Sequence, residues 1–368
     1  VETELGGEIV GRGSNDNKGP SMAALYALRC LKELGVPLRH TARVLWGCQE
    51  ESGMTDMPHF LEKHDGRLPK LFLVCDCPFP IHYAEKGIMT ADLCISAKGG
   101  NIVDFYGGLV TNAVPDFAYI VLSDIGKEEA ERALQGKPVE VDQQGDNVKI
   151  SAKGKAGHAA FPEVNTDNAI NKLACALNGS GLLRGSSEDA VRFVAQATSG
   201  YYGENLGLKS EDDISGKTTC VGGFVRYEDN IVRQNINVRY AVKADQDKLI
   251  SGLKADCDKM GAEVKNLDNN PPMYVPLDSM NGLPKKVMEI STELLDMGPL
   301  EPVVLAGGTH ARKLPNAIGY GPGLGPKLEA NRKHIGQAHG VNESVDVETM
   351  FRAIMIYAAT LIRIDDML

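Results

Sequence analysis

Three acidic clusters are the residues of this chain best suited to chemistry. Asp16 lies in the run GRGSNDNKGP, Glu50 and Glu51 stand side by side, and Asp76 opens the run DCPFPIHYAEKG. Neighbouring carboxylates repel one another unless a cation or a proton compensates them. A metal site beside one free carboxylate would supply that compensation. Taken singly, each acid is better explained as a helix cap or a solvated loop charge, because most carboxylates lie on the surface.

The segments around these acids predict an α/β sheet that would bring them together. A helix is expected from Lys18, with Gly35 as its C-terminal cap. Residues 40–47 alternate and predict a strand, and residues 71–75 predict a more apolar strand of the buried kind. Ligand sites of open α/β sheets gather beyond the carboxyl ends of the strands. Glu50 and Glu51 stand at the carboxyl end of the first predicted strand and Asp76 at that of the second, so we expect these acids to converge with Asp16.

A different pattern begins near Met89 and predicts a smaller α+β domain inserted into the first. The helix expected there covers residues 168–177. Short alternating segments predict the strands, at residues 90–96, 118–122, 148–153 and 236–242. The chain leaves this domain near Pro271-Pro272, and a helix from Pro284 to Leu295 follows. A last helix from Asp346 to about Ile364 is expected to present one apolar face, made of Met350, Phe351, Ile354, Tyr357 and Leu361.

Composition argues against several classes of protein. The 368 residues suit two domains better than one. A formal net charge of −10 disfavours binding to nucleic acid or to an anionic membrane, because both partners are negative. No apolar run approaches the roughly 20 residues that span a bilayer, and no secretion signal is visible. The eight cysteines include no CxxC pair, and we expect reduced thiols in a cytoplasmic protein.

Taken together, the acidic clusters and the run GQAHGVNE around His339 resemble the M20 family of metallopeptidases, and most closely its PepV-like dipeptidase branch. Further matching motifs are GGLVTNAVP (107–115), GKAGHAAFPEVNTDNA (154–169), NINVRY around Arg239 and GGTHAR (307–312), and the resemblance covers essentially all 368 residues. The resemblance implies an α/β zinc-peptidase catalytic domain with a central mixed sheet, made of residues 1–89 and 272–368. An inserted α+β, ferredoxin-like lid domain would span residues 90–271.

The resemblance implies a two-zinc centre with a role for each acid. Asp16 would bridge the two ions, Glu51 and His339 would complete one site, and Asp76 would join Asp16 in the other. Zn²⁺ accepts carboxylate oxygen and neutral imidazole as ligands and lowers the pKa of bound water toward ~7; Mn²⁺ or Co²⁺ would be substitutes. Glu50 would be the general base. Adjacent side chains on extended backbone point to opposite sides, which would separate the two glutamates.

The resemblance also implies a set of substrate-binding residues. His158 and Asn112 would hold the developing oxyanion, and Arg239 would grip the free carboxylate of the substrate. Thr309 and Arg312 would line the substrate site. Without the family, His158 and Asn112 would be interpreted as turn residues, and Arg239 as a strand residue with its charged head in solvent.

The His-x-Asp motif that the family carries before its bridging aspartate has no counterpart in this sequence. We therefore expect that the first strands and one zinc ligand are absent, that the chain binds at most one metal tightly, and that it has little activity. The parent reaction would be hydrolysis of a dipeptide substrate. A deacylase of N-acyl amino acids and a non-catalytic remnant stay open as alternatives. The long lid favours a monomer over a homodimer.

Overall fold

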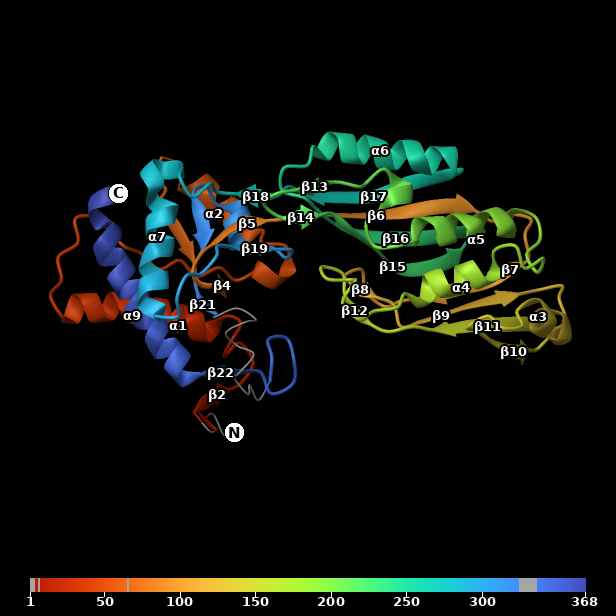
Figure 1. Cartoon of the computed structure of the whole chain (residues 1–368), viewed down its shortest axis with the longest axis horizontal. Helices are drawn as coiled ribbons and strands as arrows, with labels where there is room; N and C mark the ends of the chain where they lie inside the picture. Colours follow the sequence, from red (N-terminus) through yellow and green to blue (C-terminus); the bar gives the residue numbers. More distant parts are fainter. Residues whose placement is uncertain (1–3, 6, 65, 324–335) are drawn as a thin grey trace. The chain divides into compact units, whose positions relative to one another are not determined.

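The computed structural model describes residues 4–5, 7–64, 66–323 and 336–368. The chain forms two compact units (Figure 1). Unit 1 consists of Val1–Glu85 and Met273–Leu368, and unit 2 is the continuous segment Lys86–Pro272. From the sequence, the boundaries were expected four residues later at the first crossing, after residue 89, and one residue earlier at the second, after residue 271.

Unit 1 is built on a mixed sheet of five strands. The strands are β3 (Phe72–Val74), β5 (His82–Glu85), β18 (Met273–Tyr274), β19 (Val303–Leu305) and β20 (Ala317–Gly319). Their order is β18-β5-β20-β3, with β19 also paired to β5. The pairs β20–β3 and β19–β5 are parallel, whereas β18 and β20 run antiparallel to β5. At the β18–β5 pair, Met273 lies opposite Glu85.

Three long helices form the helical layer of unit 1. They are α1 (Lys18–Glu33), α7 (Ser279–Leu295) and α9 (Val347–Ile364). Both α1 and α7 pack against α9 (Figure 1). Each buried aliphatic side chain stabilises such a layer by roughly 1.5–3 kcal/mol. The helices and the sheet share one hydrophobic core, whose members include Ala27, Ile81, Val287, Ile318, Tyr320 and Ile356.

The remaining elements of unit 1 are short. The strands are β1 (Glu4–Leu5), β2 (Glu8–Val10), β4 (Cys77–Pro78), β21 (Pro322–Gly323) and β22 (Ser344–Asp346). The helices are α2 (Asp56–Lys63) and the 3-10 turns η1 (Glu50–Ser52), η3 (His310–Lys313) and η4 (Asp365–Met367). Because β2 pairs with both β1 and β22, the segment before α1 lies beside the strand that precedes α9.

Unit 2 contains one antiparallel sheet of eight strands. In spatial order they are β10 (Glu140–Gln144), β11 (Asn147–Lys153), β9 (Phe117–Leu122), β7 (Ile102–Gly107), β15 (Thr219–Glu228), β16 (Ile231–Tyr240), β6 (Gly87–Ser96) and β17 (Ala262–Asn270). The helices are α3 (Lys127–Ala133), α4 (Ala169–Leu177), α5 (Ser186–Ala197) and α6 (Gln246–Lys259). Short elements are β8 (Ala113–Val114), β12 (Gly157–His158), β13 (Glu211–Asp212), β14 (Gly216–Lys217) and the turn η2 (Glu204–Leu206).

The order of these elements along the chain shows how the large sheet is composed. The series β6-α5-β15-β16-α6-β17 is a ferredoxin-like βαββαβ arrangement, as the sequence predicts. Between β6 and α5 the chain adds β7, β9, β10 and β11, with α3 and α4, and extends the same sheet through the pairing of β7 with β15. The added strands therefore occupy an edge that β15 would otherwise expose.

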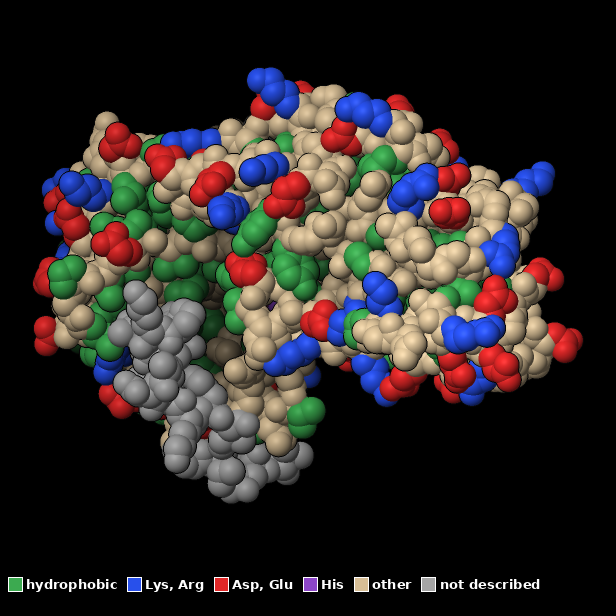
Figure 2. All heavy atoms as spheres, turned by 45° about the vertical axis from the view of Figure 1, so that its right-hand side comes forward, with side chains coloured by type: hydrophobic (Ala, Val, Ile, Leu, Met, Phe, Trp, Pro, Cys, Tyr) green, Lys and Arg blue, Asp and Glu red, His purple; other side chains and the backbone are tan. Residues whose placement is uncertain are grey.

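Unit 2 has a hydrophobic core of its own. In β6 the alternate residues Met89, Ala91, Leu93 and Ile95 are buried, as the two-residue period of a strand requires. All buried members of this core lie between residues 89 and 262. On the outside, positive and negative side chains are interspersed over the face drawn in Figure 2. Within the described ranges, no helix is long and apolar enough to cross a membrane.

Most of the expected elements are present, but the strand predicted at residues 40–47 is wrong. The helix from Lys18 is confirmed, with Gly35 at φ +66° just past its end. Residues 40–47 form no ladder with any described strand. Only the exposure of the side chains alternates there: Ala42 and Val44 are half-buried, and their neighbours are exposed. A strand also needs a partner for its backbone N–H and C=O groups, and alternation does not supply one.

The buried face of α9 also differs from the prediction. The helix itself is confirmed, and Asp346 caps it by accepting a hydrogen bond from the Thr349 N–H at 2.7 Å. The side chain of Phe351, expected on the buried face, is 64% exposed. Met350 and Ile354 of the predicted face are partly buried against the core, and Tyr357 lies on the buried face of the helix. That face is made of Ala353, Ile356, Tyr357, Thr360 and Ile364.

Candidate metal centre

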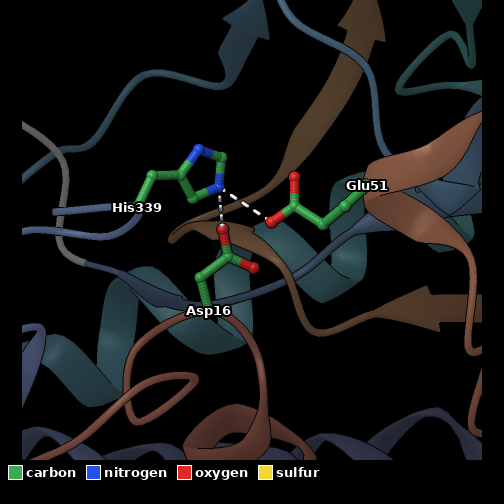
Figure 3. Close-up of side chains that lie close together, drawn as sticks. All are labelled: Asp16, Glu51 and His339. Atoms are coloured by element: carbon green, nitrogen blue, oxygen red, sulfur yellow. Dashed lines mark hydrogen bonds and ion pairs between the residues drawn. The ribbon is translucent and has the colours of Figure 1, made fainter.

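Three of the predicted ligands meet in unit 1 (Figure 3). Nε2 of His339 lies 2.8 Å from Oδ2 of Asp16 and 2.8 Å from Oε1 of Glu51. The three ligand atoms all lie within 4.8 Å of one another. Asp16 comes from the loop before α1, Glu51 from η1, and His339 from the loop before β22. A ring nitrogen carries at most one hydrogen and cannot satisfy two carboxylates, whereas one cation held between the three groups would interact favourably with all of them.

The other two predicted acids of the centre, Glu50 and Asp76, have raised pKa values. Burial raises the pKa of Glu50 to about 8, and repulsion from Asp76, Glu51 and Asp16 adds to the rise. Burial also raises the pKa of Asp76 to about 7, although a hydrogen bond of 2.8 Å from the Asn17 amide opposes that rise. The four acids therefore form one electrostatic cluster, whose mutual repulsion a bound cation would offset.

His339 stands at the sharp bend of a turn. The Gly340 N–H donates to the Gln337 carbonyl at 3.0 Å, and His339 has a φ of +63°. That backbone region favours glycine, and His339 adopts it at this turn. Burial by itself would lower the pKa of His339, but the hydrogen bond to Asp16 and the charge of Glu51 outweigh it and raise the pKa.

The backbone of the Asp16 loop is held by Glu343, a carboxylate with only 2% exposure. Its Oε1 accepts hydrogen bonds from the N–H groups of Asn15 and Asp16, at 3.1 and 2.9 Å. Its Oε2 accepts from the Gly13 N–H at 2.9 Å and from Nη1 of Arg12 at 3.1 Å. Burial would raise the pKa of Glu343, but these donors outweigh burial and lower it. Glu343 is thus an ionised carboxylate that holds the backbone of the loop carrying Asp16.

A second carboxylate, Asp56 at the start of α2, holds the loop that leads into η1. Its Oδ2 accepts hydrogen bonds from the N–H groups of Cys48 and Gln49, at 2.7 and 3.2 Å. Its Oδ1 lies 3.3 Å from Nε2 of His310. A Cβ at Gly47 would collide with the His310 ring and with Asp56, which explains the glycine at this close approach.

Glu50 and Glu51 lie in the 3-10 turn η1 and not on extended backbone, which corrects the expectation from the sequence. Successive side chains in a helix with three residues per turn point about 120° apart. The two side chains therefore still diverge, for a different reason from the one expected. Glu51 joins Asp16 and His339, and Glu50 stays outside that group of three.

Thr309 and Arg312, predicted to line a substrate site, are bound to the buried Glu85 of β5. Oε1 of Glu85 accepts from the backbone N–H and the hydroxyl of Thr309, at 3.0 and 2.7 Å. Its Oε2 accepts from Nε of Arg312 at 2.6 Å, and the Arg312 side chain is buried. Thr309 also caps η3 by accepting from the Ala311 N–H at 3.1 Å. These contacts fix the turn that carries His310.

Two further predicted residues, Asn112 and His158, lie together in unit 2. The pairing of β8 with β12 brings their segments side by side, and the Ala159 N–H donates to the Asn112 carbonyl at 2.9 Å. Nδ1 of His158 accepts from the Ala160 N–H at 3.1 Å, so the hydrogen of the neutral ring is on Nε2. Burial and the nearby charge of Arg239 lower the pKa of His158, which favours this neutral form.

Arg239 lies in β16, and its side chain is not the solvated one that the residue type alone suggests. The residue is 7% exposed, and its Nε donates to Oδ1 of Asn237 at 3.0 Å. Asn237 is also buried and stands on the same face of the strand. The guanidinium is therefore oriented by a side chain two residues earlier in the same strand.

Comparison with known proteins assigns the family. A family model described as "Peptidase family M20/M25/M40" matches residues 2–363. The chain belongs to this peptidase family. The Beta-Ala-Xaa dipeptidase of Lactobacillus delbrueckii subsp. lactis is 29% identical over 378 residues, which cover 97% of this chain and 76% of that protein. Solved structures of similar proteins include the M20 metallo-carboxypeptidase Sso-CP2 from Sulfolobus solfataricus (TM-score 0.49, 16% identity, 100% and 79% coverage) and the di-peptidase Dug1p from Saccharomyces cerevisiae (0.48, 13%, 98% and 73%).

As an M20 metallopeptidase, the chain is expected to hold a metal, and the donor set fits that requirement. Two carboxylate oxygens and one imidazole nitrogen converge in unit 1. Three protein ligands with a position left for water or substrate are typical of catalytic zinc sites. The clustered acids also repel one another without a cation, and after burial this repulsion contributes to the raised pKa of Glu50. The side chains present are therefore those that a zinc ion would need.

Glu343, Asp56 and Glu85 are residues of this M20 centre that the sequence analysis missed. Each accepts a hydrogen bond from a backbone N–H group of another loop. That loop is far away in the sequence for Glu343 and Glu85, and only a few residues away for Asp56. Such bonds leave no compositional signal, because any residue supplies a backbone N–H. Position within a motif is the one available signal, since Glu343 shares the run GQAHGVNE with His339.

Proposed function

We propose that this M20 peptidase hydrolyses dipeptides at a zinc centre in unit 1. The convergence of Asp16, Glu51 and His339 is the observation that carries the proposal. The family and the dipeptidase relatives support it. In a two-zinc centre, Asp16 would bridge the ions, Glu51 and His339 would complete one site, and Asp76 would belong to the other.

Glu50 is the proposed general base. When bound, zinc would lower the pKa of a water molecule and polarise the scissile carbonyl. Glu50 stands beside the ligand group without belonging to it. A bound cation would lower the raised pKa of Glu50, so that its ionised carboxylate could accept the proton of the attacking water. It would then deliver that proton to the amine that leaves. Zinc suits the two carboxylates and the imidazole, and Mn²⁺ or Co²⁺ would be substitutes.

The substrate-binding roles complete the proposal. Asn112 and the Nε2–H of His158 would stabilise the oxyanion, since a neutral imidazole with hydrogen on Nε2 is a donor. The buried guanidinium of Arg239 would bind the free carboxylate of the dipeptide. Unit 2 would act as the lid. Thr309 and Arg312, fixed by Glu85, would shape the substrate site from the turn η3.

We also propose that the chain works as a monomer in the cytoplasm. The pairing of β7 with β15 supports a monomer, because it covers a strand edge through which a second copy would otherwise pair. Eight unpaired cysteines suit a reducing compartment. Sedimentation at micromolar concentration tests the first point, and a mass of twice the 39.6 kDa chain would contradict it.

The test of function is turnover with added Zn²⁺ or Mn²⁺. The substrates are a dipeptide with a free amino group and the N-acetyl derivative of its C-terminal amino acid. Because the sequence lacks the family's His-x-Asp motif, we expect only weak hydrolysis of the dipeptide, abolished in Glu50→Gln, and still less reaction of the N-acetyl compound. The opposite preference would make the enzyme a deacylase. Equal background with the parent chain and Glu50→Gln on both substrates would contradict catalysis by this centre.

A further inference from the structure

We propose that Glu343 is a positioning residue that sets the metal affinity of the centre by fixing the backbone of the Asp16 loop. The proposal rests on the metal centre of the proposed function. It concerns a residue outside the ligand group, since Glu343 is turned toward backbone donors and not toward Nε2 of His339.

The carboxylate of Glu343 accepts hydrogen bonds from the backbone of Gly13, Asn15 and Asp16 and from the side chain of Arg12. Both carboxylate oxygens are used, one by Asn15 and Asp16 and the other by Gly13 and Arg12. Hydrogen bonds to an ionised acceptor are roughly twice as strong as those between neutral groups. One buried carboxylate thus fixes the direction in which the Asp16 side chain leaves the loop.

The same contacts tie the Asp16 loop to the His339 turn. The backbone carbonyl of Glu343 accepts from the Gly11 N–H at 2.8 Å and from the Ser14 hydroxyl at 3.1 Å. Nη2 of Arg12 donates to the Gly340 carbonyl, next to His339, at 3.1 Å. Asp16 and His339 are 323 residues apart in the chain, and these hydrogen bonds hold their two loops next to each other. The geometry of two ligands therefore depends on one brace.

Glu343→Gln changes the brace with little change in volume. One oxygen becomes an NH₂ group, which faces backbone N–H donors and leaves them buried without an acceptor. The loop must shift to hydrate those donors, and Asp16 shifts with it. Residues that orient metal ligands typically change affinity by about 10- to 100-fold when replaced. We expect a loss of Zn²⁺ affinity in that range.

The experiment measures Zn²⁺ affinity of the whole chain by competition with a chromophoric chelator, and the visible spectrum of the Co²⁺-loaded chain. Asp212→Asn in unit 2 is the matched control, because Asp212 also accepts from backbone N–H groups, of Ile214 and Lys243 at 3.0 and 2.7 Å. Glu343→Gln should weaken Zn²⁺ binding and shift the Co²⁺ bands. Asp212→Asn should leave both unchanged. Glu343→Gln with the affinity and spectrum of the parent chain would overturn the proposal.

Two further variants keep the result interpretable. Arg12→Ala removes an exposed partner of Glu343 and is expected to weaken Zn²⁺ binding about two- to fivefold. If Glu343→Gln does not fold, parental affinity in Arg12→Ala would overturn the proposal. His339→Ala tests the centre itself. If it binds Zn²⁺ as tightly as the parent chain, the metal centre is wrong. If it loses binding while Glu343→Gln does not, only the brace is wrong.

Discussion

At the scale of single residues, the neighbours Glu50 and Glu51 have different surroundings. Glu51 reaches Nε2 of His339 at 2.8 Å, whereas Glu50 is half-buried beside the group. Burial and the charge of Asp76 are the two largest causes of the raised pKa of Glu50. An acid held near the ligands without joining them keeps its lone pairs for a proton. Under the proposed function, Glu51 would bind the metal and Glu50 would accept the proton.

This separation predicts different results for the two substitutions. Glu50→Gln should lower kcat for a dipeptide by about 10²- to 10⁴-fold, because only the proton acceptor is lost. Its zinc content after dialysis should match that of the parent chain. Glu51→Ala should lose zinc, because it removes one of three ligands. Elemental analysis and steady-state kinetics on the same preparations check both points, and equal zinc loss in the two variants would contradict the assignment.

The sequence allowed the ligands to be predicted but not the residues that hold them. Asp16, Glu51 and His339 were identified by type and motif, and the structure brings them together. Glu343 was missed because its partners are backbone N–H groups. The substrate roles of Asn112, His158, Arg239, Thr309 and Arg312 and the second-site role of Asp76 stay predictions, because they depend on a bound substrate and a bound metal.

At the scale of elements, η1 is positioned by contacts from both α2 and η3. Asp56 of α2 accepts two backbone N–H groups from the loop before η1, and His310 of η3 contacts the same carboxylate. Burial would raise the pKa of Asp56, but those N–H groups, with His310, outweigh it and lower the pKa. The turn that carries Glu50 and Glu51 therefore depends on α2, which follows it in the chain, and on η3, which lies far away in the sequence.

Asp56→Asn is expected to destabilise the chain and to slow catalysis. Loss of charged hydrogen bonds of this kind costs about 1–3 kcal/mol of unfolding free energy, and a displaced η1 misplaces the proton acceptor. Asp366→Asn is the matched control, since Asp366 pairs with Arg39 on the surface at 2.9 Å. It should change the unfolding free energy by less than about 0.5 kcal/mol. Urea unfolding and kcat measure both effects. An Asp56→Asn chain that behaves like the control would show that Asp56 does not hold η1 in place.

The N-cap of α6 gives a prediction about pH. Asp245 accepts hydrogen bonds from the N–H groups of Lys248 and Asp247, which lower its pKa below the ordinary value. A carboxylate with a lowered folded pKa stabilises the fold above its unfolded pKa of about 3.9. That contribution disappears as the pH falls through the folded value. Asp245→Ala should therefore have a lower urea midpoint than the parent chain at pH 7, and the difference should shrink below pH ~4.

Elements with a local signal were predictable, and those that depend on a distant partner were not. The helix from Lys18 to Glu33 carries its own period and its own stop at Gly35. The segment 40–47 has the alternation of a strand but no described ladder partner. In α9 the exposed Phe351 shows a similar limit, because which side of the helix is buried depends on its contacts with α1 and α7 and not on hydrophobicity alone.

At the scale of the whole molecule, the two units obtain their cores in different ways. The core of unit 2 comes from one continuous stretch, between Met89 and Ala262. The core of unit 1 joins residues from both ends of the chain, such as Ala27 and Ile356. Unit 2 is therefore complete within its own segment, whereas unit 1 requires two segments.

The segment 86–272, expressed alone, is expected to fold. Its sheet and its core need no residue from outside the segment. Cooperative urea unfolding and dispersed amide signals in a proton–nitrogen NMR spectrum would show a native fold. A collapsed, non-cooperative state would contradict independence. By contrast, neither of the two segments of unit 1 is expected to fold when it is expressed alone.

The strand pair that closes unit 1 has a consequence for the order of folding. Met273 lies opposite Glu85, so the two ends of unit 2 emerge from adjacent positions of one antiparallel ladder. For unit 1, all of unit 2 is a hairpin connection. A flexible connection of that length carries a closure entropy that grows with the logarithm of its residue number. Once unit 2 has folded, its two ends are held close together, and this entropic cost has already been met. We therefore expect unit 2 to acquire protection from amide exchange first, and unit 1 to follow by zipping from the β5–β18 ladder outward.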